Sequence, residues 1–179
     1  VPTRRSSDLD LHGRTTNLGL YGTDSLMLTG TLRVDLSARY DRTSVGNRDR
    51  ITPVAGTGSL TGDHRFSAFN PAIAVAWMPF KQLGFDAAIA QTSRAPSAIE
   101  LGCSDPASPC RLPNALAGDP PLNQVTATTL EVGVHGSTHG PLTWRIGAFR
   151  TDSRNDILFV ANDAAGFGYF RNFGRTRRQ

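Results

Sequence analysis

The stretch LRVDLSARY at residues 32–40 alternates apolar and polar side chains along its whole length. In an extended chain successive side chains point to opposite faces, so Leu32, Val34 and Leu36 share one face while Arg33 and Asp35 share the other. A repeat of two residues predicts a β-strand with one apolar and one polar face. The rest of the sequence is therefore best examined for further strands of this kind.

The same alternation recurs along the chain, clearly in four further stretches and more weakly in the first and last. The seven predicted strands are Thr15–Asp24, Leu32–Tyr40, Phe69–Met78, Phe85–Thr92, Thr126–His135, Leu142–Arg150 and Tyr169–Thr176. No stretch predicts a helix with comparable clarity. The longest apolar run, residues 71–80, is about half the ~20 residues that a membrane-spanning helix needs.

The connections between these strands alternate in length. Those at residues 25–30, 79–84 and 137–141 are short, whereas those at residues 43–64, 94–123 and 161–168 are longer. Short turns at one end and long loops at the other are typical of outer-membrane barrels, whose strands run about 9–11 residues. The expected fold is therefore all-β, part of an antiparallel up-and-down transmembrane β-barrel with about seven strands. A soluble β-sandwich, which also alternates apolar and polar residues, is the alternative.

One motif follows the fourth predicted strand directly. Its residues are Arg94, Ala95, Pro96, Ser97, Glu100 and Leu101. They resemble the Arg-Ala-Pro-Ser-x-x-Glu-Leu signature in the barrels of TonB-dependent outer-membrane receptors. Weaker similarities to this family occur in Leu130-Glu131-Val132-Gly133 and in the Asn-x-Gly-x-Thr pattern at residues 172–176.

The resemblance implies a location in the outer membrane of a Gram-negative bacterium and active uptake of a scarce nutrient. The implied ligand is a ferric siderophore, with cobalamin or a glycan as alternatives, and the implied partners are the TonB complex and outer-membrane lipids. Residues 10–179 are expected to form part of the barrel domain, without the plug domain through which TonB acts. Residues 1–9 share no pattern with the rest and resemble a translated sequencing-adapter tail.

The polar faces of the predicted strands supply candidates for the barrel lumen or for ligand contact. These are Arg33, Asp35, Arg39, Glu131, His135 and Arg145. Arg94 and Glu100 have two interpretations, a structural ion pair at the base of a loop or direct contact with ligand.

Cys103 and Cys110 enclose six residues, two of them prolines, in the longest predicted outer loop. In an oxidising compartment such a pair usually forms a disulfide, and a ring this short contributes roughly 2–3 kcal/mol in the chain-entropy model. Two free thiols are the alternative. A zinc site needs more ligands than this segment offers, so no metal is expected.

Charge and motifs argue against two other classes of protein. Lys and Arg number 19 against 15 Asp and Glu, and the arginines are scattered except for Arg171, Arg175, Arg177 and Arg178, so no nucleic-acid partner is expected. The four histidines are dispersed, and no Gly-x-Ser-x-Gly or His-Glu-x-x-His pattern is present. We therefore expect neither an enzyme nor a cofactor, although a barrel hydrolase assembled from separate strands is a further alternative.

Overall fold

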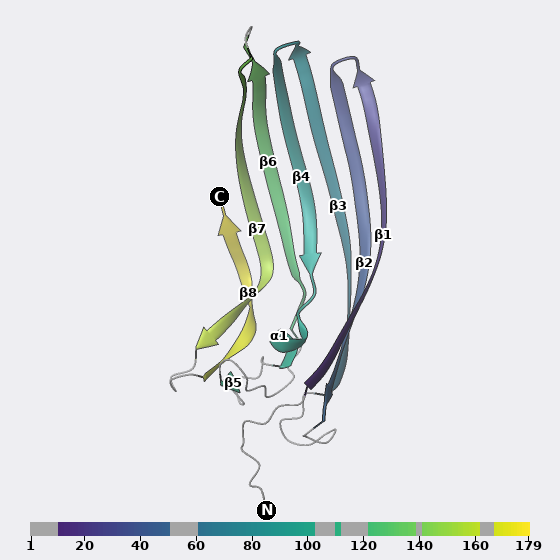
Figure 1. Cartoon of the computed structure of the whole chain (residues 1–179), viewed down its shortest axis with the longest axis vertical. Coiled ribbons are helices and arrows are strands. Elements are labelled where there is room, and N and C mark those ends of the chain that lie inside the picture. The colour runs from purple at the N-terminus through teal and green to yellow at the C-terminus, as the bar shows by residue number, and fades with distance from the viewer. Residues whose placement is uncertain (1–10, 51–60, 103–109, 112–121, 139–140, 162–166) are drawn as a thin grey trace, which may run out of the picture.

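The computed structural model describes residues 11–50, 61–102, 110–111, 122–138, 141–161 and 167–179. Almost all of these lie in strands (Figure 1). The elements in chain order are β1 (Leu11–Thr29), β2 (Leu32–Asp49), β3 (Gly62–Phe80), β4 (Leu83–Arg94), α1 (Ala98–Gly102), β5 (Cys110–Arg111), β6 (Val125–Ser137), β7 (Thr143–Ala161) and β8 (Phe167–Arg178).

All eight strands belong to one sheet, in the order β1-β2-β3-β4-β6-β7-β8-β5, and every neighbouring pair is antiparallel. The seven long strands follow chain order across the sheet and coincide with the seven strands predicted from the sequence, so the up-and-down barrel fold is confirmed. A sandwich would need a second sheet, and the described strands form only one. Among the described residues the outermost long strands, β1 and β8, do not pair with each other, so the sheet is an open section of a barrel wall.

The connections divide between the two ends of the sheet as the sequence predicts. Two-residue turns, Gly30-Thr31 and Lys81-Gln82, and the short segment from Ser137 to Thr143 lie together at one end (Figure 1). β2, β4 and β7 finish at the other end of the sheet. We call this second end the loop end, because outer-membrane barrels carry short turns at one end and long loops at the other.

All seven long strands are longer than their alternating stretches. β2 continues past Tyr40 to Asp49, and β3 begins at Gly62 rather than Phe69. In these extensions both faces carry polar residues, as in the run Arg42, Thr43 and Ser44. The apolar–polar alternation therefore stops although the strand and its ladder of hydrogen bonds continue.

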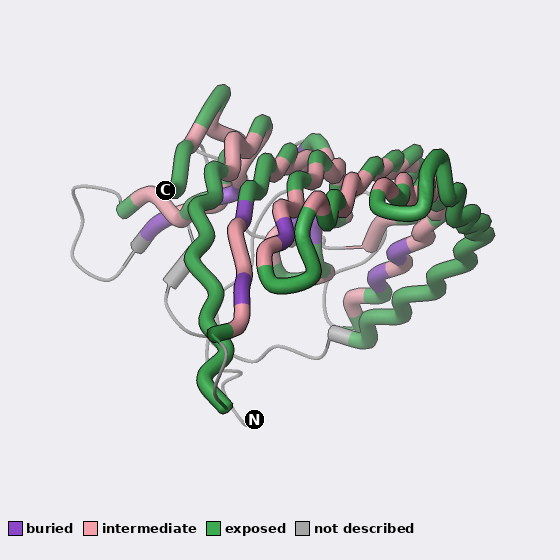
Figure 2. The backbone as a smooth tube through the Cα atoms, turned by 90° about the horizontal axis from the view of Figure 1, so that it is seen from above, coloured by how far each residue is buried: buried purple, intermediate pink, exposed green. Residues whose placement is uncertain are grey.

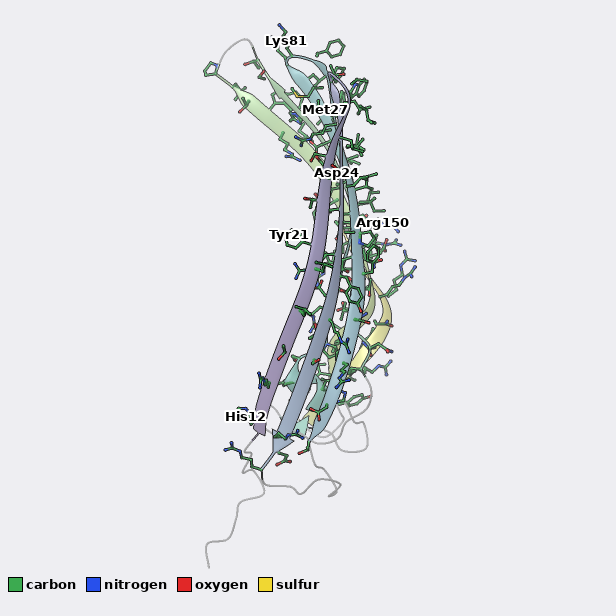
Figure 3. All side chains as sticks on the ribbon, turned by 90° about the vertical axis from the view of Figure 1, so that its right-hand side faces the viewer. His12, Tyr21, Asp24, Met27, Lys81 and Arg150 are labelled. Atoms are coloured by element: carbon green, nitrogen blue, oxygen red, sulfur yellow. The ribbon has the colours of Figure 1, made fainter. Side chains whose placement is uncertain are left out.

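The register assigns one apolar and one polar face to the sheet, because directly paired residues lie on the same face. Leu36 pairs with Ile73, Ile73 with Ile89, and Ile89 with Leu130, and all four side chains are exposed. We call this apolar side the outward face, the one that meets lipid in a membrane barrel. The opposite side is the inward face, and it includes Arg33, which pairs with Ala76. Figure 3 shows Tyr21, an inward residue, and Arg150, an outward one, on opposite sides of the sheet.

Buried residues are few, as expected of a single sheet layer (Figure 2). Those with apolar side chains form one cluster at the loop end: Val45, Leu101, Leu122, Val125 and Ile157. Leu101 belongs to α1, a five-residue helix that the sequence pattern did not predict. No helix in the described part of the chain is long and apolar enough to cross a membrane.

Candidate ligand site on the inward face

The signature motif forms the step from β4 into α1. β4 ends at Arg94, and Pro96 is fully buried directly after it. The Ser97 hydroxyl accepts a hydrogen bond from the Glu100 backbone N–H at 3.2 Å, while the Glu100 carboxylate accepts one from the Ser97 N–H at 2.7 Å. This reciprocal pair is a capping box, which satisfies two backbone donors at the helix start. It explains why so short a helix forms here.

Arg94 and Glu100 close this step with a two-point ion pair. Arg94 Nη1 lies 2.7 Å from Glu100 Oε2, and Nη2 lies 3.0 Å from Oε1. Burial of Glu100 acts to raise the pKa of its carboxyl group. The bonds from Arg94 and Ser97 outweigh burial and hold that pKa below its ordinary value.

The helix is fixed against the inner wall by one apolar and one polar contact. Leu101 is 1% exposed in the cluster with Val45 and Val125. The Asn47 side chain, itself buried, donates a hydrogen bond to the Ala98 carbonyl at 3.2 Å. A side chain at Gly13 would meet the Ala98 Cβ at 3.3 Å, so this glycine leaves room for the helix.

A second polar group lies on the inward face of β2 and β3. Arg39 Nε donates to both Asp41 oxygens at 2.9 Å. The Asn70 amide donates to Asp41 at 3.3 Å and to the Ser93 hydroxyl at 3.0 Å, which links this group to the end of β4. A Cβ at Gly19 would overlap the Arg39 guanidinium, so a side chain at this position would displace the guanidinium from its present place.

These two groups share one cavity of about 550 Å³ at the loop end. Arg39 and Asp41 line it from β2, and Arg94 with the following three residues lines it from the signature motif. The remaining lining residues are Thr15, Asn17, Thr43, Phe66, Ala68, Ser93 and Gln124. Its size lies within the range of small-molecule sites, and its walls provide cationic, anionic and amide groups. We call it the inward cavity.

A third polar group lies on the same face, nearer the short turns. Asp86 accepts hydrogen bonds from Arg145 at 2.7 Å, and its other oxygen lies 3.3 Å from His135 Nδ1. A Cβ at Gly133 would come within 2.5 Å of the Asp86 carboxylate, and one at Gly84 would overlap the His135 ring. Two glycines thus make room for an ionic group on an otherwise crowded strand surface.

The structure places all six candidate lumen residues on the inward face but distributes them among several groups. Arg33 bonds to Asp35 at 3.1 Å, and Ser25 donates to Asp35 at 2.6 Å. Glu131 pairs across the ladder with Ala88 and with Phe149 and makes no polar side-chain contact within the described residues. Only Arg39 lines the inward cavity. A role for any of them in ligand binding stays a proposal.

The sequence pattern did not identify Asp41, Asn70 or Gln124 as members of a site. Asp41 is bonded through Arg39 and Asn70, and Gln124 donates to the Ser67 carbonyl at 2.7 Å. These contacts depend on how β2, β3 and β6 are aligned, which no short motif reports. Cys103 lies outside the described residues and Cys110 is described only as part of β5, so the disulfide stays a prediction. No group of three possible metal ligands occurs in the described ranges.

The family model and the solved structures that match this chain point to the same family. The family model described as TonB dependent receptor-like, beta-barrel, matches residues 2–179. A search of curated proteins found no match. Among solved structures, the copper transporter OprC aligns with a TM-score of 0.73 at 18% identity, over 92% of this chain and 24% of that one. The FrpB iron transporter from Neisseria meningitidis (F3-3 variant) aligns at 0.66 and 17% identity, over 96% and 23%.

A third solved structure, the alcaligin outer-membrane receptor FauA from Bordetella pertussis, aligns with a TM-score of 0.61 at 12% identity, over 93% of this chain and 27% of that one. At such identities the likeness shows the fold. The chain spans about a quarter of the length of each of these three proteins.

Proposed function

Because the chain belongs to the TonB-dependent receptor family, as part of its β-barrel domain, we propose that it forms the wall of an outer-membrane transporter that imports a ferric siderophore. Cobalamin and a glycan are the alternative ligands. The proposed location is the outer membrane of a Gram-negative bacterium. The proposed partners are TonB, acting through a plug domain, and the surrounding lipids.

The observation that carries this proposal is the inward cavity. It lies at the loop end, where a ligand arriving from outside would first meet the barrel wall. The Arg39 and Arg94 side chains are each about half exposed there, at 47% and 51%, so each can hydrogen-bond an additional partner. Guanidinium groups bind carboxylates and other planar oxyanions in a two-point manner, and such oxygen groups are typical of iron-chelating ligands.

The two arginines differ in their expected roles. Arg94 is bonded through both terminal nitrogens to Glu100, which favours a structural role at the loop base. Arg39 bonds to Asp41 mainly along one edge and lies on the cavity wall. We therefore assign ligand contact to Arg39 and positioning to Arg94.

Uptake by the intact receptor tests the proposal. A strain without its other iron receptors would express the receptor under iron limitation and be offered radiolabelled iron as a panel of siderophores, with labelled cobalamin in parallel. We expect TonB-dependent iron uptake with at least one siderophore, and about tenfold weaker binding in Arg39→Gln, the loss expected for one charge-assisted hydrogen bond. Arg48→Gln, on the outward face, is the matched control. Uptake of cobalamin alone would refute the siderophore assignment.

A further inference from the structure

The Asn-x-Gly-x-Thr pattern at residues 172–176 of β8 lies beside a kink in β7. Within the described residues, β7 pairs with β6 only as far as Arg154, and its remaining residues pair with β8. At the kink Asn155 has a φ of 54°, a left-handed conformation that Asn tolerates better than most side chains. The parts of β7 and β8 beyond this point turn away from the other strands (Figure 1). The proposed function has not yet given this pattern a role.

Asn172 ties the three residues before β6 to this kink. We call these residues, 122–124, the return segment. The Asn172 side-chain oxygen accepts a hydrogen bond from the Asn123 backbone N–H at 2.8 Å, and its amide nitrogen donates to the Asn123 carbonyl at 3.0 Å. The same nitrogen donates to the Asn155 carbonyl at 2.7 Å. A primary amide offers an acceptor and two donors, so one side chain gives Asn123 the two bonds that a strand ladder would otherwise supply.

The return segment lies beyond the point where its neighbouring strand ends. Arg94, the last residue of β4, pairs with Val125, the first residue of β6. The residues before Val125 therefore have no β4 residue opposite them, and their backbone groups need other partners. Asn123 obtains them from β8, while the Gln124 side chain donates to the Ser67 carbonyl of β3 at 2.7 Å. The return segment is thus tied to β8 through one residue and to β3 through the next.

The return segment also forms part of the inward cavity. Gln124 lines the cavity wall. Leu122 is buried in the apolar cluster that surrounds Leu101 of α1, and Phe170, two residues before Asn172 on β8, packs against the same cluster. The position of the return segment therefore determines one wall of the cavity and the packing of the helix that follows the signature motif.

We propose that Asn172 is a positioning residue of the inward cavity, acting through the return segment although it lies outside the cavity lining. Its three hydrogen bonds fix Asn123 relative to β7 and β8, and Asn123 directly precedes Gln124 of the cavity wall. A wall that is already ordered raises ligand affinity, because binding does not have to order it. The inference rests on the proposed function, in which this cavity is the ligand site.

Hydrogen exchange and uptake kinetics of the intact receptor test this role together. Asn172→Leu keeps the approximate size of the side chain but removes all three hydrogen bonds, and Asn172→Asp replaces the amide nitrogen with an oxygen that would face two carbonyl groups. In both variants exchange at residues 122–126 should become about tenfold faster. The ferric siderophore that wild type imports fastest in the uptake panel would be the probe. Its concentration for half-maximal uptake should rise about tenfold, with the maximal rate unchanged.

The matched control is Thr129→Val. It removes the 3.0 Å hydrogen bond between the Thr129 and Thr151 hydroxyls, a cross-strand contact of the inward face that touches neither the return segment nor the cavity. Exchange at residues 122–126 and the half-maximal concentration should both equal those of wild type. Heat-modifiable migration on gels would verify that every variant is an assembled barrel.

Two results would overturn the proposal. One is wild-type exchange at residues 122–126 in both Asn172 variants. The other is faster exchange there with an unchanged half-maximal concentration, which would make Asn172 a purely structural residue. A wild-type receptor that imports no siderophore would refute the proposed function, whereas the exchange result would still decide whether Asn172 positions the return segment.

Discussion

Arg94 and Glu100 form a two-point ion pair, at 2.7 and 3.0 Å, that joins the end of β4 to the first turn of α1 across the five residues between them. The same carboxylate also accepts the Ser97 backbone N–H. One side chain therefore joins the strand, the capping box and the helix, and the buried Leu101 follows it directly. We therefore expect this contact to hold α1 in place at the end of β4.

Replacing Glu100 with Gln should loosen the attachment of α1 to β4. The neutral amide keeps the size of the side chain but loses the charge that Arg94 pairs with, at a cost of about 1–2 kcal/mol for a half-exposed charged hydrogen bond. Hydrogen exchange of the intact receptor should accelerate at residues 97–102. Glu131→Gln, on the same inward face without a polar partner within the described ranges, should leave exchange at residues 97–102 unchanged. Equal exchange in Glu100→Gln and wild type would show that the cap and Leu101 suffice.

The same contact predicts a dependence on acidity. The pKa of Glu100 is lowered in the folded protein. The ionised carboxylate therefore stabilises the fold fully at pH values above the ordinary glutamate pKa of about 4.3. This stabilisation is lost as the pH falls through the pKa of Glu100 in the folded protein. Hydrogen exchange at residues 97–102, corrected for the intrinsic rate, should be constant from pH 7 to 5 and rise below about pH 4. In Glu100→Gln the rise should be absent. A rise of the same size in the variant would assign it to other carboxylates.

The strands were predictable from the sequence because lipid on one side and water on the other impose a strict repeat of two. Leu32 to Tyr40 is the clearest case, and the structure confirms it. The extension of β2 to Asp49 was not predictable, since both faces there are polar. α1 had a local signal, the Ser-x-x-Glu spacing of Ser97 and Glu100, but its five residues are too few for a helical repeat to show.

The members of the inward cavity were only partly predictable. Arg94 and Pro96 belong to one short, recognisable motif, so their sequence neighbourhood indicates a site. Asp41 and Asn70 meet only because β2 and β3 pair with Arg39 opposite Asn70. Register is set by the whole set of cross-strand contacts, which a single segment does not report. For the same reason, the three contacts of Asn172 require the pairing of β7 with β8.

The disulfide prediction is tested by mass. If Cys103 and Cys110 form a disulfide in receptor that folded in an oxidising compartment, alkylation without reductant should add no mass. Alkylation after reduction should then add two alkyl groups. Closing so short a ring is worth roughly 2–3 kcal/mol in the chain-entropy model. Cys103→Ser/Cys110→Ser should therefore be cut faster by protease within residues 103–121. Two alkyl groups added to unreduced protein would establish free thiols instead.

The glycine beneath Asp86 provides a test of the inward ionic group. In Gly133→Ala the new Cβ would come within 2.5 Å of the Asp86 carboxylate, which has to move away from Arg145. Because a terminal group on a short side chain can partly adjust, we expect a cost of about 1 kcal/mol, measured as a lower unfolding temperature of the barrel in detergent. Gly147→Ala is the matched control, since Gly147 pairs directly with Gly133 and its nearest contact is the Val132 carbonyl at 3.3 Å. Equal losses in both variants would attribute the effect to the strand backbone rather than to Asp86.

The assignment of faces is tested by a charge placed in the apolar band. Val34 lies on the outward face beside Leu26 and Val75, so Val34→Arg should destabilise the barrel by about 2–4 kcal/mol if the position is near the bilayer midplane. Ser37→Arg is the matched control, because Ser37 lies on the inward face opposite Ala72, where the arginine would meet water. Folding titrations into lipid vesicles give the difference directly. If Ser37→Arg were the more damaging of the two, inward and outward would be exchanged throughout the sheet, since a one-residue slip inverts every side chain.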